Sequence, residues 1–453
     1  MKRVNFNKNK ITVKMKNIFI LTALFLINNI GIAQNANITI SNSTTTSCTT
    51  CWVGNIFSPN TNNFTISVSE INTRIRTGSV TITTSCASCT ESGTIKINNN
   101  INQQNEPNYI TTPLLKFIAN NSIIINATID LGLKQAGNTE RLGIPAASIE
   151  FSSTNGDIIS STNGIIKTDP LASADGGNVK FTANNGSVQI NAAITTSGKN
   201  AGYIEIFGKN GVTIAANITA SGGSTGILKI TDNNLTSSTD LTNQGQISGT
   251  IKVASFEKLG TGIFQLKGSN IWSGNTNITG SIILGSNDAI PSTSSSLIFN
   301  GGTLVPNGFN QTINGSLKVN SNSYIDFDPN LSSNITINSI DPLPSTVYLY
   351  ILDWEGFYQP SALNQNGKLS TSSPFVSVNG NLINTVTGGL NQYGQKITNV
   401  AGSGGKKGKL FITTNPSSYP DKIRFYNSTL DKYFTSKILT SGNIYEIIPN
   451  TIL

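Results

Sequence analysis

NNGSVQINAAITTSG at residues 184–198 and KNGVTIAANITASG at residues 209–222 are two copies of one short polar sequence motif. Both alternate apolar with polar residues and are bounded by Asn and Gly, a pattern that indicates strands and turns rather than helix. Four pairs of positions align at an offset of 24 residues: Val188 with Val212, Ile190 with Ile214, Ile194 with Ile218, and Gly198 with Gly222. Such repetition favours a fold built from one recurring unit.

The same unit recurs at residues 114–130, 149–160 and, more weakly, 226–234. Equivalent apolar positions are separated by 34, 30 and 25 residues: Phe117, Phe151, Phe181 and Ile206. A repeat of this length with insertions in its turns is typical of a solenoid, in which each coil buries its apolar face against the next. A β-propeller needs longer blades of four strands, and a drifting period argues against ring closure. We therefore predict an all-β fold, a right-handed parallel β-helix.

Asparagine recurs at the turn of each unit, as Asn121, Asn155, Asn185 and Asn210. Asn tolerates left-handed backbone conformations and hydrogen-bonds within turns, and stacked Asn side chains form ladders. We assign these residues a structural role in the turns rather than a role in ligand binding.

The opening segment has the pattern of a secretory signal peptide. Basic residues up to Lys16 precede the apolar run IFILTALFLI at 18–27, which is too short to span a bilayer. Small residues then mark a cleavage site, so we predict cleavage near Ala33. Met15 begins a segment of ordinary signal length, and the true start is therefore either Met1 or Met15.

Removal of this segment changes the charge balance. Six of the 30 basic residues and none of the 22 acidic residues lie before residue 34, which leaves 24 basic against 22 acidic residues and a net charge of +2. Phosphate binding normally needs a basic stripe, so we expect no nucleic acid among the partners. No later segment has the length and apolarity of a transmembrane helix. We expect a protein that is not integral to the membrane, either secreted or on the outer cell surface.

GSVTITTSCASCTESGTIKINNNI at 78–101 and GSVQINAAITTSG at 186–198 are coil units that resemble those of the filamentous-haemagglutinin-type exoproteins, and this likeness covers residues 65–235. Residues 258–308 carry a second set of motifs: K-x-G-x-G at 258–262, G-S-N-x-x-x-G at 268–274, T-x-I-x-G at 276–280, L-G at 284–285, A-I-P at 289–291 and G-G-T-L at 301–304. This set resembles the autotransporter-associated β-strand repeat. In it we expect glycines at turns between coils, and Pro291 in a turn because it cannot donate to a ladder.

Together the resemblances imply an exported β-helical surface or secreted protein of bacterial type. LYILDWEGF at 349–357 and SGNIYEIIP at 441–449 resemble the way such proteins finish after the repeat. The resemblance implies that the secretion machinery of the outer membrane is a partner, and it leaves the route across that membrane open. The chain is either complete at Leu453 or a fragment of a longer exoprotein.

All four cysteines lie in two similar phrases, TTSCTTC at 45–51 and TTSCASC at 83–89. Export to an oxidising compartment favours disulfides, whereas two C-x-x-C pairs in a reduced compartment suggest zinc or redox chemistry. Both phrases follow a predicted strand, so we place them at comparable turns of neighbouring layers. Four cysteines allow three pairings, and we favour the bridges between layers, Cys48–Cys86 and Cys51–Cys89.

The chain has no histidine, which excludes Ser-His-Asp and Cys-His catalysis and His-ligated metals. Polysaccharide cleavage is the enzyme alternative, because it uses paired carboxylates or a carboxylate cluster that holds calcium beside a base. Asp326 and Asp328 share one face of a predicted strand and are the metal candidates, although they also fit as solvent-facing residues beside inward Ile325 and Phe327. The other candidate carboxylates are Asp341, Asp353 and Glu355.

Aromatic residues gather just after residue 347, where Tyr348, Tyr350 and Trp354 are the candidates for a glycan-binding platform. Alternating aromatics in a strand also pack a terminal coil against a cap. We expect five segments in the chain. They are a signal peptide (1–33), an N-terminal capping region with the cysteine pairs (34–110), β-helix coils (111–250), the autotransporter-associated-repeat β-helix (251–360) and a C-terminal β region (361–453).

These patterns favour a structural or adhesive protein, an adhesin or matrix component, with no cofactor and no enzymatic activity. A rigid rod would present ladders of polar side chains and loops to extracellular glycans or other cell surfaces, and many weak contacts would add through multivalency. The alternative is a polysaccharide-active β-helix lyase or hydrolase. Such an enzyme needs carboxylates and a base that converge on one face of adjacent coils.

Overall fold

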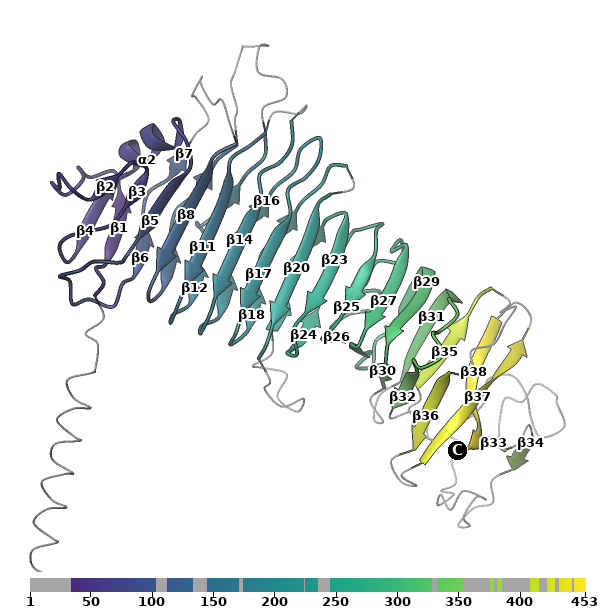
Figure 1. The fold of residues 1–453 in the computed structure, drawn as a ribbon. Helices are drawn as coiled ribbons and strands as arrows, with labels where there is room; N and C mark the ends of the chain where they lie inside the picture. Colours follow the sequence, from purple (N-terminus) through teal and green to yellow (C-terminus); the bar gives the residue numbers. More distant parts are fainter. Residues whose placement is uncertain are drawn as a thin grey trace, which may run out of the picture.

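The computed structural model shows an elongated stack of coils (Figure 1). It describes residues 34–102, 112–132, 145–170, 174–223, 225–234, 245–327, 332–352, 375–378, 381–384, 408–414, 422–427, 432–441 and 444–453. The predicted signal peptide, residues 1–33, lies outside these ranges. Within them the regular secondary structure is β-strand except for one helix, and most strand pairs are parallel. The prediction of a parallel β-helix is confirmed.

Two long columns of parallel strands form the first and second faces of the coils. The first face consists of β3 (Ile56–Phe57), β5 (Val80–Thr83), β8 (Leu114–Ala119), β11 (Ser148–Ser153), β14 (Val179–Ala183), β17 (Ile204–Gly208), β20 (Ile227–Asp232), β23 (Ser255–Leu259), β25 (Thr276–Ile278), β27 (Ser296–Asn300), β29 (Gln311–Ser321), β31 (Ser333–Ile340) and β35 (Gly408–Ile412). One residue position runs in register from β5 to residues 316–321 of β29. β35 pairs with residues 333–337 of β31, which are in register with residues 311–313 of β29 and not with β27.

The second face runs beside the first. It consists of β4 (Phe64–Ser67), β1 (Ile38–Ser41), β6 (Ile95–Ile97), β9 (Ile123–Ile125), β12 (Ile158–Ser160), β15 (Val188–Ile190), β18 (Val212–Ile214), β21 (Gly245–Ile247), β24 (Ile263–Leu266), β26 (Ser281–Leu284), β28 (Thr303–Val305), β30 (Ser323–Asp326), β32 (Leu349–Leu352) and β36 (Ile423–Asn427). Parallel pairing continues through residues 110 and 250, since β5 pairs with β8 and β20 pairs with β23. The predicted segment boundaries stay predictions.

A third, shorter face closes the coils of the first half. It consists of β7 (Ile101–Asn102), β10 (Ile129–Asp130), β13 (Ile166–Lys167), β16 (Ile194–Thr195), β19 (Ile218–Thr219) and β22 (Ile251–Lys252). After β22 this column continues only as an isolated parallel bridge between Lys252 and Ile271. The third face is therefore interrupted after residue 252, and parallel pairing in the stretch of chain between the second and first faces resumes at residues 311–313 of β29 and 335–337 of β31.

The strand register confirms the repeat alignment read from the sequence. Phe117 pairs with Phe151, Phe151 with Phe181 and Phe181 with Ile206. Val188 likewise pairs with Val212. All of these side chains are fully buried, and the strands alternate buried and half-buried residues. Period-2 alternation thus places one apolar row inside the solenoid.

Side-chain hydrogen bonds link the turn asparagines across coils. Asn155 donates to Asn120 at 3.2 Å, and Asn185 donates to Asn155 at 3.3 Å. Asn210 donates to the Asn185 carbonyl oxygen at 2.7 Å. The non-glycine residues with positive φ in the described ranges are Asn63, Asp288 and Asn307. The side-chain ladder therefore runs from Asn120 through Asn155 to Asn185, whereas the predicted Asn121 donates to the Thr94 hydroxyl at 3.4 Å, and none of the predicted turn asparagines has a left-handed backbone.

Glycine is required where successive coils touch. A Cβ atom on Gly186 would lie 2.1 Å from the Gly156 carbonyl oxygen of the preceding coil, a distance that backbone atoms do not tolerate. In the second repeat region, Gly260, Gly268 and Gly301 have positive φ, as expected for turn glycines. Pro291 lies outside the strands, as predicted.

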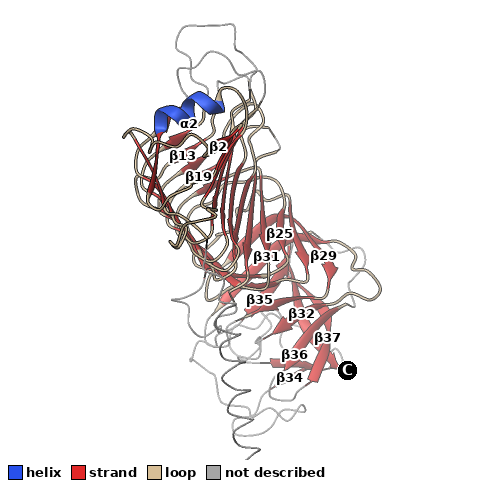
Figure 2. Ribbon diagram, turned by 60° about the vertical axis from the view of Figure 1, so that its left-hand side comes forward, coloured by secondary structure: helices blue, strands red, loops and turns tan. Residues whose placement is uncertain are grey.

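A short helix lies against the N-terminal coils (Figure 2). Helix α2 (Val68–Ile75) buries Val68, Ile71 and Ile75, and the Ser67 side chain caps it by accepting a hydrogen bond from the Glu70 backbone N–H. Sequence reasoning missed this helix. The signals were the Ser67-x-x-Glu70 capping box and the i, i+3, i+7 spacing of the apolar residues.

Antiparallel hairpins occur at both ends of the stack. Near the N-terminus β2 (Trp52–Val53) pairs with β3. Near the C-terminus β37 (Lys432–Ser441) pairs with β38 (Ile444–Ile452), and this hairpin connects β35 with β36, because β38 pairs with β35 and β37 with β36. A separate antiparallel pair is formed by β33 (Phe375–Val378) and β34 (Asn381–Asn384). The C-terminal hairpin covers the edges of the last coil, which would otherwise be open to further pairing.

Candidate functional site

Five tyrosines gather on the outward side of the C-terminal coils. They include the predicted residues Tyr348 and Tyr350, together with Tyr324, Tyr426 and Tyr433; we call these five the tyrosine patch. In β32 the neighbours Leu349 and Ile351 are buried, so strand alternation turns Tyr350 outward. Strand register then aligns Tyr324 of β30 with Tyr350, and the antiparallel pairing of β36 with β37 brings Tyr433 opposite Tyr426.

The rings of the patch hold one another in place. The centroids of Tyr324 and Tyr350 are 5.3 Å apart with 21° between the ring planes, which is a stacked pair. Tyr433 tilts against Tyr350 at 5.4 Å and against Tyr426 at 5.0 Å. Tyr433 is 41% exposed. Mutually packed rings lose little conformational freedom on binding a ligand, so the patch is preorganised.

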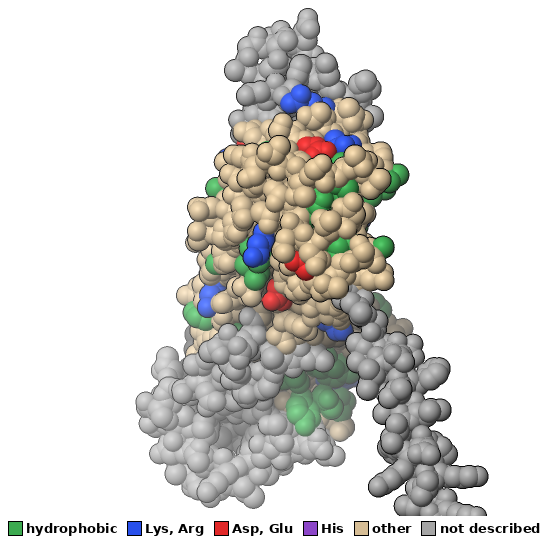
Figure 3. Space-filling model, turned by 90° about the vertical axis from the view of Figure 1, so that its left-hand side faces the viewer, with side chains coloured by type: hydrophobic (Ala, Val, Ile, Leu, Met, Phe, Trp, Pro, Cys, Tyr) green, Lys and Arg blue, Asp and Glu red, His purple; other side chains and the backbone are tan. Residues whose placement is uncertain are grey.

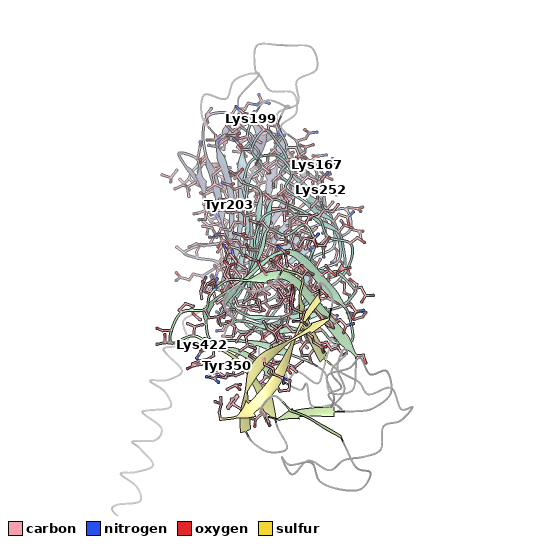
Figure 4. All side chains as sticks on the ribbon, turned by 90° about the vertical axis from the view of Figure 1, so that its right-hand side faces the viewer. Lys167, Lys199, Tyr203, Lys252, Tyr350 and Lys422 are labelled. Carbon is pink, nitrogen blue, oxygen red and sulfur yellow. A yellow bond between two sulfur atoms is a disulfide. The ribbon has the colours of Figure 1, made fainter. Side chains whose placement is uncertain are left out.

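Two cations lie over Tyr348. The Lys422 Nζ atom is 4.9 Å from the ring centroid, and the Arg424 Cζ atom is 5.1 Å from it, both within cation–π range. Lys422 also donates to the Ser345 carbonyl oxygen at 2.9 Å, which fixes its position. Figure 4 shows Lys422 close to Tyr350 and far from the other labelled residues. Apolar ring surface and positive charge therefore meet at one place.

The tyrosine hydroxyls add hydrogen-bonding capacity. Partial burial, followed by the neighbouring tyrosines, raises the pKa of Tyr350, and the Arg424 charge only partly offsets this. The Tyr350 phenol is therefore protonated at neutral pH and is both a donor and an acceptor.

Several predicted site residues fall outside the described ranges: Trp354, Asp328, Asp353 and Glu355. Asp326 is described and half-buried, on the same outward side of β30 as Tyr324, and Ile325 and Phe327 are buried beside it as predicted. Asp341 forms an ion pair with Lys318 at 3.7 Å. Among the residues that the structure describes, no group of three or more His, Cys, Asp or Glu is placed to hold a metal ion.

Sequence reasoning missed five members of this site: Tyr324, Tyr426, Tyr433, Lys422 and Arg424. For Tyr324, Arg424 and Tyr426 a signal exists, because YID at 324–326, YIL at 350–352 and RFY at 424–426 are equivalent segments of successive coils. Tyr433 reaches the patch only through the C-terminal hairpin, and hairpin register is not visible in a repeat pattern.

The predicted disulfides between layers are wrong. The structure pairs Cys48 with Cys51 and Cys86 with Cys89, with Cα–Cα distances of 5.7 and 5.5 Å. The strands that precede the two phrases are not equivalent, because β1 belongs to the second face and β5 to the first. Cys51 packs in the main core, whereas Cys86 and Cys89 form a separate cluster with Ala36. Each bridge therefore closes its own turn.

Peptide mapping distinguishes these pairings. Trypsin cleaves after Arg74 and Arg76, which lie between the two cysteine phrases. From unreduced, denatured protein we expect two separate peptides, one bridged at Cys48–Cys51 and one bridged at Cys86–Cys89. A single species that falls apart only after reduction would mean bridges between layers. Since each loop is short, we expect a stabilisation of about 2 kcal/mol per bridge.

A buried lysine occupies the solenoid core in the second repeat region. Lys258 is fully buried and lies between Ile230 and Ile278 in the strand register. Its Nζ atom donates to the Leu259 carbonyl oxygen at 2.6 Å and to the Asp232 carbonyl oxygen at 3.4 Å. Burial lowers the pKa of Lys258 to about 8, although the Asp232 charge raises it. This amine, the first residue of the K-x-G-x-G motif, satisfies turn carbonyls inside the coil.

The partner carboxyl is also buried. Asp232 accepts hydrogen bonds from the backbone N–H groups of Val212 at 3.1 Å and Asn234 at 2.8 Å. Burial nevertheless raises the pKa of Asp232. The shifts of both groups come mainly from desolvation of the charged form. Both side chains are fully buried, so we interpret the pair as structural.

A hollow of about 650 Å³ lies where the third face ends. Its lining includes Lys252, Ser273 and Asn275, together with Ile271, which is 55% exposed. Buried Trp272 forms part of its floor and donates from Nε1 to the Thr276 hydroxyl at 2.8 Å.

No protein-family model, curated protein or solved structure matches this chain. The resemblances to the filamentous-haemagglutinin-type exoproteins and to the autotransporter-associated repeat therefore stay predictions. Among the described residues no helix has the length and apolarity needed to cross a membrane.

Proposed function

We propose that this chain is an exported structural or adhesive solenoid that binds glycans through the tyrosine patch. The observation that carries the proposal is the patch itself, in which preorganised aromatic rings, phenol hydroxyls and two cations meet on the outside of the C-terminal coils. Apolar ring surface with nearby hydrogen-bonding groups suits sugars, which present both C–H faces and hydroxyls.

Acidic sugars fit this surface best. Lys422 and Arg424 lie beside the rings, and Arg makes two parallel hydrogen bonds to a carboxylate. Asp326 on the neighbouring strand adds one negative charge near the edge of the patch, so positive charge predominates over it. We therefore propose uronate-bearing or similarly acidic glycans as the ligand class.

The elongated solenoid provides length and a surface that repeats from coil to coil. On the face shown in Figure 3, backbone and side chains that are neither apolar nor charged cover most of the described surface, and charged groups are scattered over it. Cross-coil hydrogen bonds such as Asn126 to Asn98 at 2.9 Å and Asn320 to Asn300 at 2.8 Å keep these polar rows ordered. Ordered rows favour many weak contacts, whose sum exceeds any single affinity.

Export and surface display belong to the same proposal. The signal-peptide pattern before residue 34 and the two family resemblances support passage through the outer-membrane secretion machinery. The alternative is a polysaccharide-active lyase or hydrolase. The two proposals predict different outcomes for a bound polysaccharide. An enzyme would shorten it, whereas an adhesive protein would leave its length unchanged.

Replacing Tyr433 with alanine tests the patch. We expect Tyr433→Ala to weaken binding of an acidic polysaccharide such as alginate by about 2- to 10-fold, because one exposed ring contact is lost. Binding would be measured by titration against immobilised alginate, with dextran as the neutral comparison. Val53→Ala is the control, since Val53 is 76% exposed and lies on β2 at the N-terminal end of the stack, far from the tyrosine patch. Equal affinities for the two variants would overturn the assignment of the site.

A further inference from the structure

A row of alternating charge runs along the outward side of the first face. Six in-register positions on β8, β11, β14, β17, β20 and β23, which lie side by side in Figure 1, carry Lys116, Glu150, Lys180, Glu205, Lys229 and Glu257. We call these six residues the charge row. Ion pairs join Lys116 to Glu150 at 2.9 Å, Lys180 to Glu205 at 3.3 Å and Lys229 to Glu257 at 3.5 Å. Neutral Thr81 and Asn277 bound the row.

The order of signs in the charge row is self-complementary on reversal. Read from the other end, each position carries the opposite charge. A second copy that faces the first with its long axis reversed therefore sets Lys against Glu throughout: Lys116 against Glu257, Glu150 against Lys229, and Lys180 against Glu205. A parallel copy in the same register would set like charges against each other at every position, and a parallel copy shifted by one strand would pair only five of the six positions, so the antiparallel arrangement is the one that pairs the whole row.

We propose that two copies of this chain associate through their first faces in an antiparallel, face-to-face dimer. The two-fold axis lies along the strand direction, between β14 and β17, where Lys180 and Glu205 are neighbours. Such an interface is isologous, so each contact occurs twice. The neutral residues at the ends of the row, Thr81 and Asn277, also face each other under this operation.

The proposed two-fold axis also places an exposed side chain of one copy at a hollow in the other copy. Tyr203 precedes β17 and is 38% exposed. Beside it lies a hollow of about 230 Å³ whose lining includes Glu150, Asn178 and Lys180. The axis carries the coil of β17 onto the coil of β14, so Tyr203 of the second copy comes to lie over Asn178, at this hollow. Shape and charge therefore indicate the same arrangement.

The interface is small. Six strands at about 4.8 Å spacing and five residues at about 3.3 Å each give a face of about 30 by 16 Å. The two copies together then bury about 1,000 Å², at the lower end of specific interfaces. We expect a reversible dimer with a dissociation constant of about 1–100 µM rather than a permanent one.

Inversion of the whole row tests the proposal. The inverted variant carries Lys116→Glu, Glu150→Lys, Lys180→Glu, Glu205→Lys, Lys229→Glu and Glu257→Lys. It keeps opposite charges on neighbouring strands, so the coils retain their ion pairs, and unfolding curves check this. Sedimentation velocity measures self-association of each protein, and energy transfer between differently labelled proteins measures mixing.

We expect wild type and inverted variant each to dimerise alone and not to exchange subunits with each other, because the mixed antiparallel pair opposes like charges. Preferential formation of the mixed pair would show a parallel arrangement and overturn the proposal. Monomeric wild type at concentrations up to about 100 µM would also overturn it. As a second variant with an unchanged row, Tyr203→Ala is expected to raise the dimer dissociation constant by about tenfold; no change would remove Tyr203 from the interface and contradict the proposed axis.

Discussion

Replacing Phe151 with alanine is expected to lower the free energy of unfolding by about 3–5 kcal/mol. Phe151 is fully buried, and its ring stacks between Phe117 at 5.4 Å and Phe181 at 5.1 Å. Removing the middle ring leaves a cavity between Phe117 and Phe181. The neighbouring coils are held by strand pairing and cannot move together to fill it. Denaturant unfolding followed by circular dichroism measures the loss.

The matched control is Phe207→Ala. Phe207 lies on β17 in the same face, but strand alternation turns it outward and leaves it half-buried. We expect this variant to lose about 1 kcal/mol or less. Because repeat arrays unfold coil by coil, hydrogen exchange would locate the Phe151→Ala loss in β8, β11 and β14. Equal losses for both variants would contradict an inward stack at 117, 151 and 181.

Stability is expected to rise by about 3 kcal/mol between pH 8 and pH 10.5 because of Lys258, whose pKa burial lowers to about 8 from 10.5. In this window the unfolded chain keeps the lysine proton while the folded chain has released it, so the folded state is favoured as the pH increases. Below pH 8 both states are charged, and the folded state bears the full cost of burying the ammonium group.

The variant Lys258→Met isolates this effect. It removes the titrating group at similar volume, so the rise attributed to residue 258 is expected to disappear from the difference between the two pH curves. Lys252→Met, which replaces an exposed lysine, is expected to keep the rise. The free energy of unfolding at each pH comes from denaturant titration. A variant curve parallel to that of the wild type would show that Lys258 is not the source.

The register between coils was predictable from the sequence because every coil places apolar side chains at equivalent strand positions to fill the interior. Apolar residues at Val188 and Val212, or at Phe151 and Phe181, must face one interior, and period-2 alternation permits only one register that buries them. Turn insertions do not disturb this, since they lie outside the strands. The Asn ladder followed for the same reason, because equivalent turns stack directly on each other.

The cysteine pairing was not predictable, because two similar cysteine motifs need not occupy equivalent positions in the coils. Both phrases follow a strand, but those strands lie on different faces. The charge row, in contrast, was visible and overlooked: LKF, IEF, VKF, IEI, LKI and FEK alternate in sign at equivalent positions.

The tyrosine patch was only partly predictable from the sequence. Tyr324 and Tyr350 belong to successive coils, so a longer repeat alignment would have joined them. Tyr433 arrives through β37, an antiparallel strand that follows no repeat. Contacts made by a terminal hairpin depend on its pairing with the last coil, and repeat spacing carries no information about that pairing.

The most direct test of the proposed function combines binding and cleavage in one assay. Purified chain from residue 34 onward would be incubated with acidic and neutral polysaccharides, with calcium present, and both retention of the protein and the length of the polymer would be measured. We predict retention on acidic polysaccharide, weaker after Tyr433→Ala, with the polymer length unchanged. Shortened polymer with new chain ends would contradict the adhesive account and establish the polysaccharide-active alternative.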